Sequence, residues 1–390
     1  MSMEAETKGK GMTYGKITDP ELARLRERIG NIVHPYRYHE AASKDAIRHF
    51  TDGIGDDNPL WRDETYGRKT RHGDIIAPPC FLYSVHWPAG GGGLPGVHGY
   101  HSGNDWEFYK TIHLDDTITV QVIPGDIVEK KRSNFAGRSV ISYTDSIYRN
   151  QNSEIVAKST GWSVRAERQA SKEKGKFAHI SKYRYSPEEL QAIEDAYDRE
   201  EIRGSTPRFW EDVNEGDELV PVVKGPLNLT DLHAYIAGTL GGSAGGRGGA
   251  HKFGILYRRR HPAWAYTDPE TGAVDIPEMV HASDGMADEI GIPLAYDYGC
   301  QRPCWAGHLV TNWMGDDGFL KRLYVRLTSF NMLGDTTWCK GKVSRKYVEG
   351  EEHLVELELK GENQRGEDNF TGSATVLLPY RGYKPLMAPR

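Results

Sequence analysis

The residues that could carry out chemistry gather around His281, in the last third of the chain. Asp275 and Glu278 come shortly before it, and Gly299 follows eighteen residues after it, just ahead of an apolar segment at 302–314. An imidazole has an ordinary pKa of about 6.5, so it exchanges protons near neutral pH, and a neighbouring carboxylate can fix its tautomer. Backbone amides at the start of a helix bind negative charge. This set fits general acid–base catalysis on a compound that develops a negative oxygen; the alternative is a structural histidine.

A second group of polar residues lies in the first half of the chain. It reads Gly55-Asp56-Asp57-Asn58-Pro59-Leu60-Trp61, and His72 stands directly before Gly73-Asp74-Ile75-Ile76-Ala77-Pro78-Pro79. Asp56 could order a water molecule, and Asn58, Trp61 and His72 could line a binding site.

The elements that must position these residues recur in the same order twice. The first set comprises helical patterns at 21–30 and 41–50, an apolar helical run at 75–87, and β-type alternation from 105 to about 165. The second set comprises a helix at 229–237, a glycine-rich insertion to about residue 275, the apolar helix at 302–314, and strand patterns as far as residue 378. An α+β fold follows, with helices first and an antiparallel sheet after them.

The chain therefore divides into four parts. Residues 1–20 form a loose, flexible start, 21–166 a first domain, 167–206 a charged linker that contains a helix from Pro187, and 207–390 a second domain.

Two short strings show that the domains are copies of one unit. Leu114-Asp115-Asp116-Thr117 matches Leu333-Gly334-Asp335-Thr336, and Asn150-Gln151-Asn152-Ser153-Glu154 matches Asn363-Gln364-Arg365-Gly366-Glu367. A sheet with one apolar face needs a cover, and a central helix within each unit, with two units paired, provides it.

The string from Gly55 to Trp61 resembles the Gly-Asp-x-Asn-Pro-Leu-His motif of the MaoC-like group, which includes the (R)-specific enoyl-CoA hydratases. The resemblance covers about 30–165 and 207–380, and the first half resembles a FAS1-type dehydratase domain. It implies a double hot-dog, in which each antiparallel sheet wraps around a long central helix. It also implies that an Asp and a His activate a water molecule, while a Gly amide at the helix start holds a thioester carbonyl.

The first half departs from this family pattern at two positions. Trp61 stands where the family has His, and Pro79 stands where it has the Gly, eighteen residues later. Proline has no amide N–H and cannot hold the carbonyl. We expect a degenerate site that still shapes the acyl tunnel through Asn58, Trp61 and His72.

The second half keeps what the first has lost. His281 falls at the family's His position and Gly299 at its Gly position, but Ile276 replaces the Asp. The replacement carboxylate is Asp275 or Glu278 on the same half, or Asp56 from the other half. The resemblance thus predicts a surviving site in the second half.

The remaining polar residues give fewer indications. Arg258 and Arg260 belong to the densest basic run outside the linker and could bind CoA phosphates; the alternative is a solvated surface. The four cysteines, Cys80, Cys300, Cys304 and Cys339, lack the spacing of a zinc site and are expected to be buried thiols. We expect no metal and no cofactor other than CoA within the substrate.

The composition excludes several classes of protein. The 390 residues carry a net charge of −6 and 38% hydrophobic residues. Neither a nucleic-acid binder nor a membrane-surface protein has this charge balance. No apolar run approaches the roughly 18 residues of a membrane span, and the first residues do not resemble a signal peptide, so we expect a cytoplasmic protein.

The function expected from the resemblance is hydration of an enoyl-CoA thioester, or the reverse dehydration of a 3-hydroxyacyl-CoA. The alternatives are a non-catalytic acyl-CoA-binding protein, the partner subunit of a heteromeric hydratase, and a thioesterase. A homodimer or higher oligomer is expected, or a heteromer with another MaoC-like chain.

Overall fold

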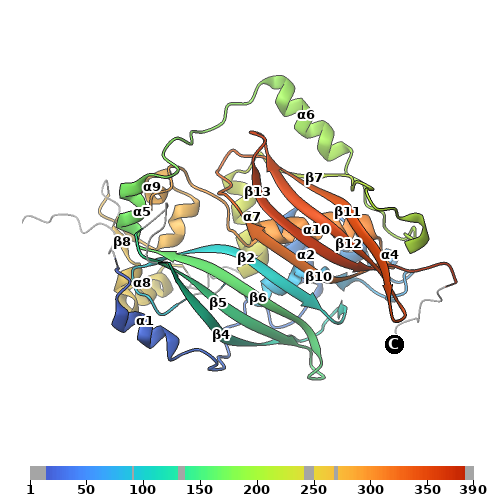
Figure 1. The fold of residues 1–390 in the computed structure, drawn as a ribbon, viewed down its shortest axis with the longest axis horizontal. Helices are drawn as coiled ribbons and strands as arrows, with labels where there is room; N and C mark the ends of the chain where they lie inside the picture. Colours follow the sequence, from blue (N-terminus) through green and yellow to red (C-terminus); the bar gives the residue numbers. More distant parts are fainter. Residues whose placement is uncertain (1–14, 90–91, 131–136, 241–249, 268–270, 383–390) are drawn as a thin grey trace, which may run out of the picture.

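One antiparallel sheet of nine strands organises the whole molecule. The computed structural model describes residues 15–89, 92–130, 137–240, 250–267 and 271–382. The strand order is β4-β5-β6-β2-β10-β13-β12-β11-β7, and the strands of each half lie next to one another (Figure 1). The first half contributes β2 (His98–Phe108), β4 (Thr119–Lys130), β5 (Ser139–Arg149) and β6 (Ile155–Ala166). The second half contributes β7 (Val222–Lys224), β10 (Phe319–Leu327), β11 (Thr337–Glu349), β12 (Glu352–Asn363) and β13 (Asp368–Leu377).

The two halves join through the antiparallel pair β2–β10. In its register Trp106 lies opposite Leu323, and both side chains are fully buried. On the other face, Arg322 donates two hydrogen bonds to the Asp105 carboxylate across the junction. Backbone pairing and side-chain packing therefore make the two sheets continuous.

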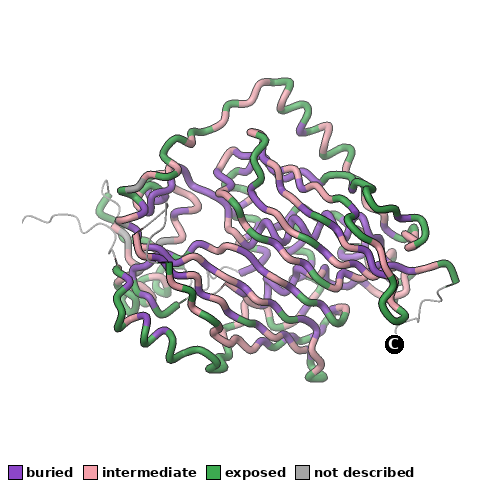
Figure 2. The backbone as a smooth tube through the Cα atoms, viewed as in Figure 1, coloured by how far each residue is buried: buried purple, intermediate pink, exposed green. Residues whose placement is uncertain are grey.

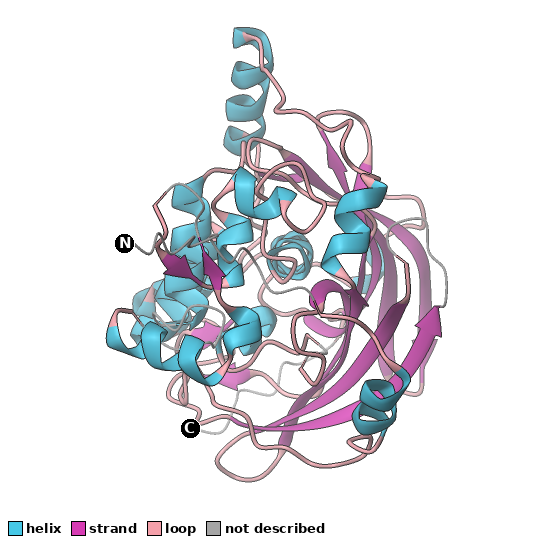
Figure 3. Cartoon of the chain, turned by 90° about the vertical axis from the view of Figure 1, so that its left-hand side faces the viewer, coloured by secondary structure: helices cyan, strands magenta, loops and turns pink. Residues whose placement is uncertain are grey.

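Helices cover the concave side of the curved sheet (Figure 3). Those of the first half and the connection are α1 (Asp19–Arg26), α2 (Lys44–Ile54), α3 (Pro59–Arg62), α4 (Glu64–Gly67), the 3-10 helix η1 (Pro79–Ser84), α5 (Arg168–Lys174) and α6 (Pro187–Asp198). Those of the second half are η2 (Trp210–Asp212), α7 (Leu229–Leu240), α8 (Lys252–Arg260), η4 (Pro262–Trp264), η5 (Pro277–His281), α9 (Asp284–Asp288) and α10 (Gln301–Met314). Two small ladders complete the described structure: β1 (Ile76–Ala77) with β3 (Ile112–His113), and β8 (Tyr266–Thr267) with β9 (Val274–Asp275).

The central helix of the second half is α10, whose fourteen residues are all buried. Figure 2 shows this burial along α10 and the inner strands, whereas α6 is mostly exposed. The equivalent segment of the first half is much shorter. The predicted apolar helix at 75–87 is instead a two-residue strand followed by the six-residue helix η1. Two consecutive prolines, Pro78 and Pro79, prevent a regular helix from starting earlier.

Helices α2 and α7 pack against each other across the two halves. Ser43 caps α2 at its start, and Gly55 ends it in the left-handed conformation with φ of 63°. The helices approach closely because α7 has Gly238 at the contact, where a Cβ would lie 2.1 Å from the His49 carbonyl oxygen. This contact fixes the motif that follows α2 against the second half.

The duplicated turns have the same hydrogen bonds. Gln151 Nε2 donates to Asp116 Oδ1 at 2.7 Å, and Gln364 Nε2 donates to Asp335 Oδ1 at 2.6 Å. Each aspartate also accepts, through Oδ2, from the backbone three residues earlier. The matched strings of the sequence are thus structurally equivalent, and the duplication is confirmed.

Several expectations for the connecting segments need correction. The loose start predicted for 1–20 lies largely outside the described residues, but α1 begins within it at Asp19. The stretch after Ala166 contains α5, where Arg168 and Ser171 are fully buried, so it is more than a solvated linker. The glycine-rich insertion contains α8 and the β8–β9 hairpin in its described part; 241–249 and 268–270 lie outside it.

Candidate active site

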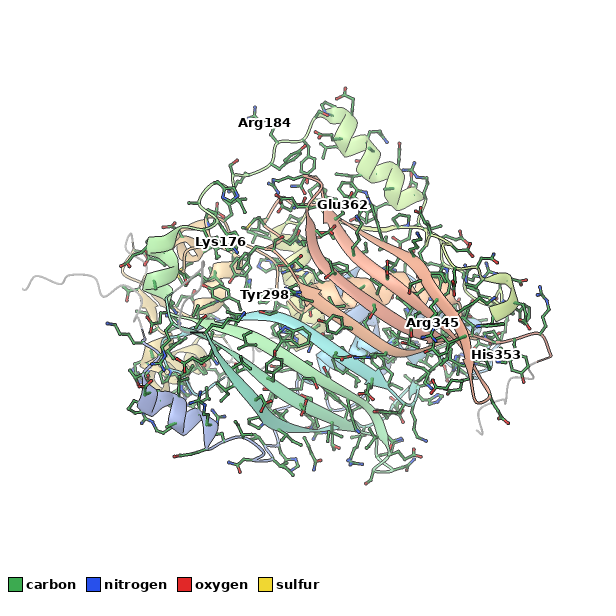
Figure 4. All side chains as sticks on the ribbon, in the orientation of Figure 1. Lys176, Arg184, Tyr298, Arg345, His353 and Glu362 are labelled. Carbon is green, nitrogen blue, oxygen red and sulfur yellow. The ribbon has the colours of Figure 1, made fainter. Side chains whose placement is uncertain are left out.

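A cavity of about 660 Å³ opens between the two halves, next to the start of α10. Aromatic and polar residues of both halves line it, among them Trp87, His98, Tyr100 and His101 from the first half and Glu278, His281, Tyr298 and Gly299 from the second. Figure 4 places Tyr298 near the junction of the two sets of strands. The structure therefore brings three of the candidate residues, His281, Gly299 and Glu278, to one cavity.

His281 ends the short helix η5 and is held in a defined tautomer. Its Nδ1 lies 2.9 Å from the Tyr296 carbonyl oxygen. A carbonyl oxygen can only accept, so Nδ1 carries the proton in the neutral imidazole, and Nε2 then carries the lone pair. The ring contacts Tyr298 at 3.9 Å between centroids, with the two planes tilted by 33°, and it meets Tyr296 edge-on at 4.8 Å. This arrangement presents a base with a fixed orientation.

Of the three carboxylates considered for His281, only Glu278 lines the cavity. The pKa of Tyr296 is raised well above its usual range, mainly by burial and also by neighbouring charges that include Glu278. The Glu278 carboxylate therefore lies near Tyr296, the residue whose carbonyl holds His281. Asp275 is exposed on β9, and its Oδ1 accepts from the Ile276 amide. The structure does not bring Asp275 to the site because the β8–β9 hairpin carries it to the surface.

Gly299 lies one residue before the N-cap of α10. Within the described chain, its amide N–H has no protein acceptor, so it is available at the positive end of a fourteen-residue helix. A Cβ at this position would lie 3.0 Å from Leu327 Cδ1 and 3.1 Å from His101 Cβ. Only glycine fits here without moving a neighbour.

A buried ion pair anchors the start of α10. Arg302 Nε lies 2.8 Å from Asp297 Oδ2, and Arg302 Nη1 donates to the carbonyl oxygens of Ser329 and Asn369. Burial raises the pKa of Asp297 to about 6, although the Arg302 charge opposes this shift. Both residues line the cavity, and sequence reasoning missed Asp297 because nothing in its spacing marks it.

The equivalent site of the first half is nearly filled. Its cavity measures only about 40 Å³ and is lined by Asn58, Trp61 and His72, among others. The Trp61 indole occupies the position of the missing His and donates from Nε1 to Asp56 Oδ2 at 3.0 Å. His72 Nε2 lies 3.2 Å from the Asp316 carbonyl oxygen. These residues line a small cavity, and a role in shaping an acyl tunnel stays a prediction.

Asp56 takes part in a buried network and does not reach His281. Besides Trp61, its carboxylate accepts from the Asn58 amide at 3.1 Å, and Oδ1 lies 3.5 Å from His308 Nε2. The Lys224 ammonium donates to His308 Nδ1 at 2.9 Å, and His308 Nε2 lies 3.0 Å from Glu200 Oε1. Asp56 is thus a structural residue that ties the first half to α10.

The basic run lies on α8 beside the cavity, not in it. Tyr257 and His261 line the cavity, whereas Arg258 and Arg260 do not. Helix α8 therefore presents Tyr257 and His261 to the cavity, and Arg258 and Arg260 do not line it.

The cysteines offer no reactive thiol. All four are free and buried, and burial raises the pKa of Cys300, of Cys304 and of Cys339, the last to about 12. The thiols of Cys300, Cys304 and Cys339 therefore stay protonated. Across the described ranges no cluster of three or more His, Cys, Asp or Glu side chains could hold a metal ion. No helix in the described ranges is long and apolar enough to span a bilayer.

Comparison with known proteins matches a family model to the first half. Residues 29–159 match the FAS1-like dehydratase domain region. A UPF0336 protein of Parafrankia sp. is 31% identical over 126 residues, which cover 30% of this chain and 78% of that protein. A UPF0336 protein of Streptomyces griseus subsp. griseus is 24% identical over 149 residues, 36% of this chain and 95% of that protein. These relatives match about a third of this chain.

Solved structures share the fold of nearly the whole chain. A MaoC-like dehydratase superposes with a TM-score of 0.60 and 15% identity, over 91% of this chain and 99% of the other. A MaoC domain protein dehydratase from Chloroflexus aurantiacus gives 0.54 and 11%, over 97% and 100%. A Mycobacterium tuberculosis protein with a double hot-dog fold gives 0.52 and 10%, over 91% and 97%. The chain therefore belongs with the UPF0336 proteins, carries a FAS1-like dehydratase region at residues 29–159, and has a double hot-dog fold that it shares with solved MaoC-like dehydratases.

Proposed function

We propose that this MaoC-type dehydratase adds water reversibly to an enoyl-CoA thioester, at the site in its second half. The observation that carries the proposal is the oriented His281, whose Nδ1 is held by the Tyr296 carbonyl in the same cavity as the Gly299 amide. CoA enters as part of the substrate.

In the proposed hydration, the lone pair on His281 Nε2 accepts a proton from water as the water oxygen forms a bond to C3 of the enoyl group. The electrons of the double bond move to the thioester carbonyl, which becomes an enolate. As the enolate collapses, the His281 imidazolium returns the same proton to C2, so the product carries OH on C3 and H on C2 and His281 is neutral again. Negative charge on the carbonyl oxygen is stabilised by the Gly299 amide and the positive end of α10. Glu278 orders the water. Dehydration follows the same steps in reverse.

The reaction is tested by following the enoyl absorbance band with CoA esters of increasing size. Wild-type protein should consume the band and form the 3-hydroxyacyl ester. His281→Ala should lower kcat by about 10²–10⁴-fold, the range of a lost general base. Asp275→Asn, a carboxylate outside the cavity, is the matched control and should keep wild-type turnover. Full turnover in His281→Ala would refute the assignment.

Both halves of a single chain line the cavity, so we propose that the chain is active without a MaoC-like partner. Purified protein should turn over alone, and light scattering on the same sample gives its oligomeric state. Binding of CoA esters without turnover would favour a non-catalytic protein or a partner subunit. Release of free thiol would favour a thioesterase.

A further inference from the structure

The cavity of the second half contains a histidine that comes from the first half. His101 lies on β2, opposite Ser163 of β6, and a register shift follows it before Gly103. It lines the cavity together with His281 and Gly299. The sequence offers no sign of this role, because His101 lies 180 positions before His281 in the chain.

His101 lies directly against the residue that should hold the substrate carbonyl. A Cβ on Gly299 would lie 3.1 Å from His101 Cβ and 3.2 Å from His101 Cδ2. Cδ2 is bonded to Nε2 within the imidazole, so this ring nitrogen lies close to the Gly299 backbone. The glycine makes room for the histidine at the start of α10.

The ring nitrogens of His101 lack a hydrogen bond of good geometry to any described residue, and neither is exposed to solvent. A weaker hydrogen bond with the Asn104 side chain is the smallest of the causes that act on the pKa of His101, and it raises that pKa. Burial first, and then the Arg302 charge, lower the pKa of His101 to about 4. The imidazole is therefore neutral at pH 7, with one N–H to donate. A buried polar group without a good partner calls for an explanation, and a bound substrate oxygen would provide one for His101.

We infer that His101 is a second catalytic residue of the site: its neutral imidazole donates a hydrogen bond to the thioester carbonyl oxygen that the Gly299 amide also binds. The inference rests on the proposed function for the identity of the substrate. A neutral imidazole at a helix start is suited to this task, because it polarises a carbonyl group without adding a competing acid. The first half would then act in catalysis through β2, although the cavity beside its own motif is small.

A binding experiment separates this inference from the proposed reaction. Butyryl-CoA and its thioether analogue S-butyl-CoA differ by the carbonyl oxygen, and titration calorimetry of the full chain gives the affinity for each. Wild-type protein should prefer the thioester. His101→Phe keeps a flat ring but has no donor, and it should reduce this preference by roughly 3- to 10-fold. His101→Gln keeps a donor and should retain part of the preference.

A matched control makes the same substitution far from the cavity. His353 lies on β12 near the right-hand edge of the molecule in Figure 4, whereas Tyr298 lies near the middle. The His353 ring stacks on Tyr380 at 4.2 Å between centroids. His353→Phe keeps this stack and should leave both affinities unchanged. The thermal unfolding midpoint of each variant shows whether it is folded.

Kinetics on an enoyl-CoA ester complete the test. His101→Phe should lower kcat by about 10²-fold with a smaller change in KM, as expected for a donor that acts mainly in the transition state. A folded His101→Phe that keeps both the thioester preference and kcat would overturn the inference, as would a wild-type protein with no thioester preference. The wild-type protein could prefer the thioester in a way that depends on His101 and yet show no turnover. That result would refute the proposed reaction and support the hydrogen bond from His101 to the carbonyl oxygen.

Discussion

The Trp61 indole donates a hydrogen bond of 3.0 Å to the Asp56 carboxylate, so the residue in the family's His position is bonded to the motif's remaining acid. Both side chains are buried, at 3% and 2% exposure. In the family motif these two positions hold the residues that activate water. Here they hydrogen-bond to each other in the interior of the first half. Activity should therefore be independent of this pair, but stability should depend on it.

Replacing Trp61 by Phe tests this separation. The variant keeps most of the buried ring but leaves one oxygen of Asp56 without its donor. An unsatisfied buried polar group costs roughly 1–3 kcal/mol, so the free energy of unfolding in urea should fall by about this amount. Turnover at 25 °C should stay at the wild-type value. Loss of activity in a folded Trp61→Phe protein would show that the first half retains a catalytic site.

The buried network around Lys224 predicts a larger effect. The Lys224 ammonium donates to the carbonyl oxygens of Ile54 and Gly55 and to His308 Nδ1. Lys224→Met removes the cation that faces the Asp56 and Glu200 carboxylates, and breaking a buried charge network by removing one partner costs about 3–5 kcal/mol. Urea denaturation measures the loss. Adding Glu200→Gln should recover part of it, and a double variant less stable than Lys224→Met would contradict this account.

His72 should make the protein sensitive to acid. Burial, followed by the Arg71 charge, lowers the pKa of His72 to about 4, below its value of about 6.5 in an unfolded chain. Between these two values the unfolded chain binds more protons, so stability falls as the pH falls through this window. His72→Gln keeps a donor for the Asp316 carbonyl and does not titrate. The loss of unfolding free energy between pH 7 and pH 5 should be about 1–2 kcal/mol smaller in His72→Gln than in wild type. Equal losses would show that His72 does not titrate differently on folding.

Gly299→Ala should damage catalysis more than folding. The added Cβ would press on His101 and Leu327, at 3.1 Å and 3.0 Å. A small displacement of groups at the reacting centre can lower the rate by as much as about 10²-fold, so we expect kcat to fall by about 10- to 100-fold. The thermal unfolding midpoint should change little, because the Leu327 side chain can move. Ala306→Gly, a small-residue change further along the same helix, is the control for effects on the helix itself.

Tyr298 should act on His281 through its ring and not through its hydroxyl group. The two rings lie 3.9 Å apart, and Trp87 braces Tyr298 from the other side at 5.6 Å. Tyr298→Phe keeps the ring contact and should retain most of kcat, whereas Tyr298→Leu removes it. A lost aromatic contact is worth about 0.5–1.5 kcal/mol, which corresponds to a roughly 2- to 13-fold lower kcat. Equal activity of the Phe and Leu variants would argue against this positioning role.

The sequence by itself determined the duplication, and it paired His281 with Gly299 as candidates for one site. The matched strings around Asp116 and Asp335 make the same turn because each aspartate and glutamine satisfies the same backbone groups, a local requirement that short motifs record. The spacing between His281 and Gly299 likewise records a local relationship, since one segment of chain carries both to the start of α10.

Only the tertiary structure decided which partners surround these residues. Asp275 and Glu278 are three positions apart, yet a hairpin takes one to the surface while a 3-10 helix places the other in the cavity. Asp56 is engaged by Trp61 and His308, and His101 reaches Gly299 only because β2 pairs with β10 across the two halves. Contacts between distant segments depend on strand pairing and helix packing, which leave no fixed spacing in the chain.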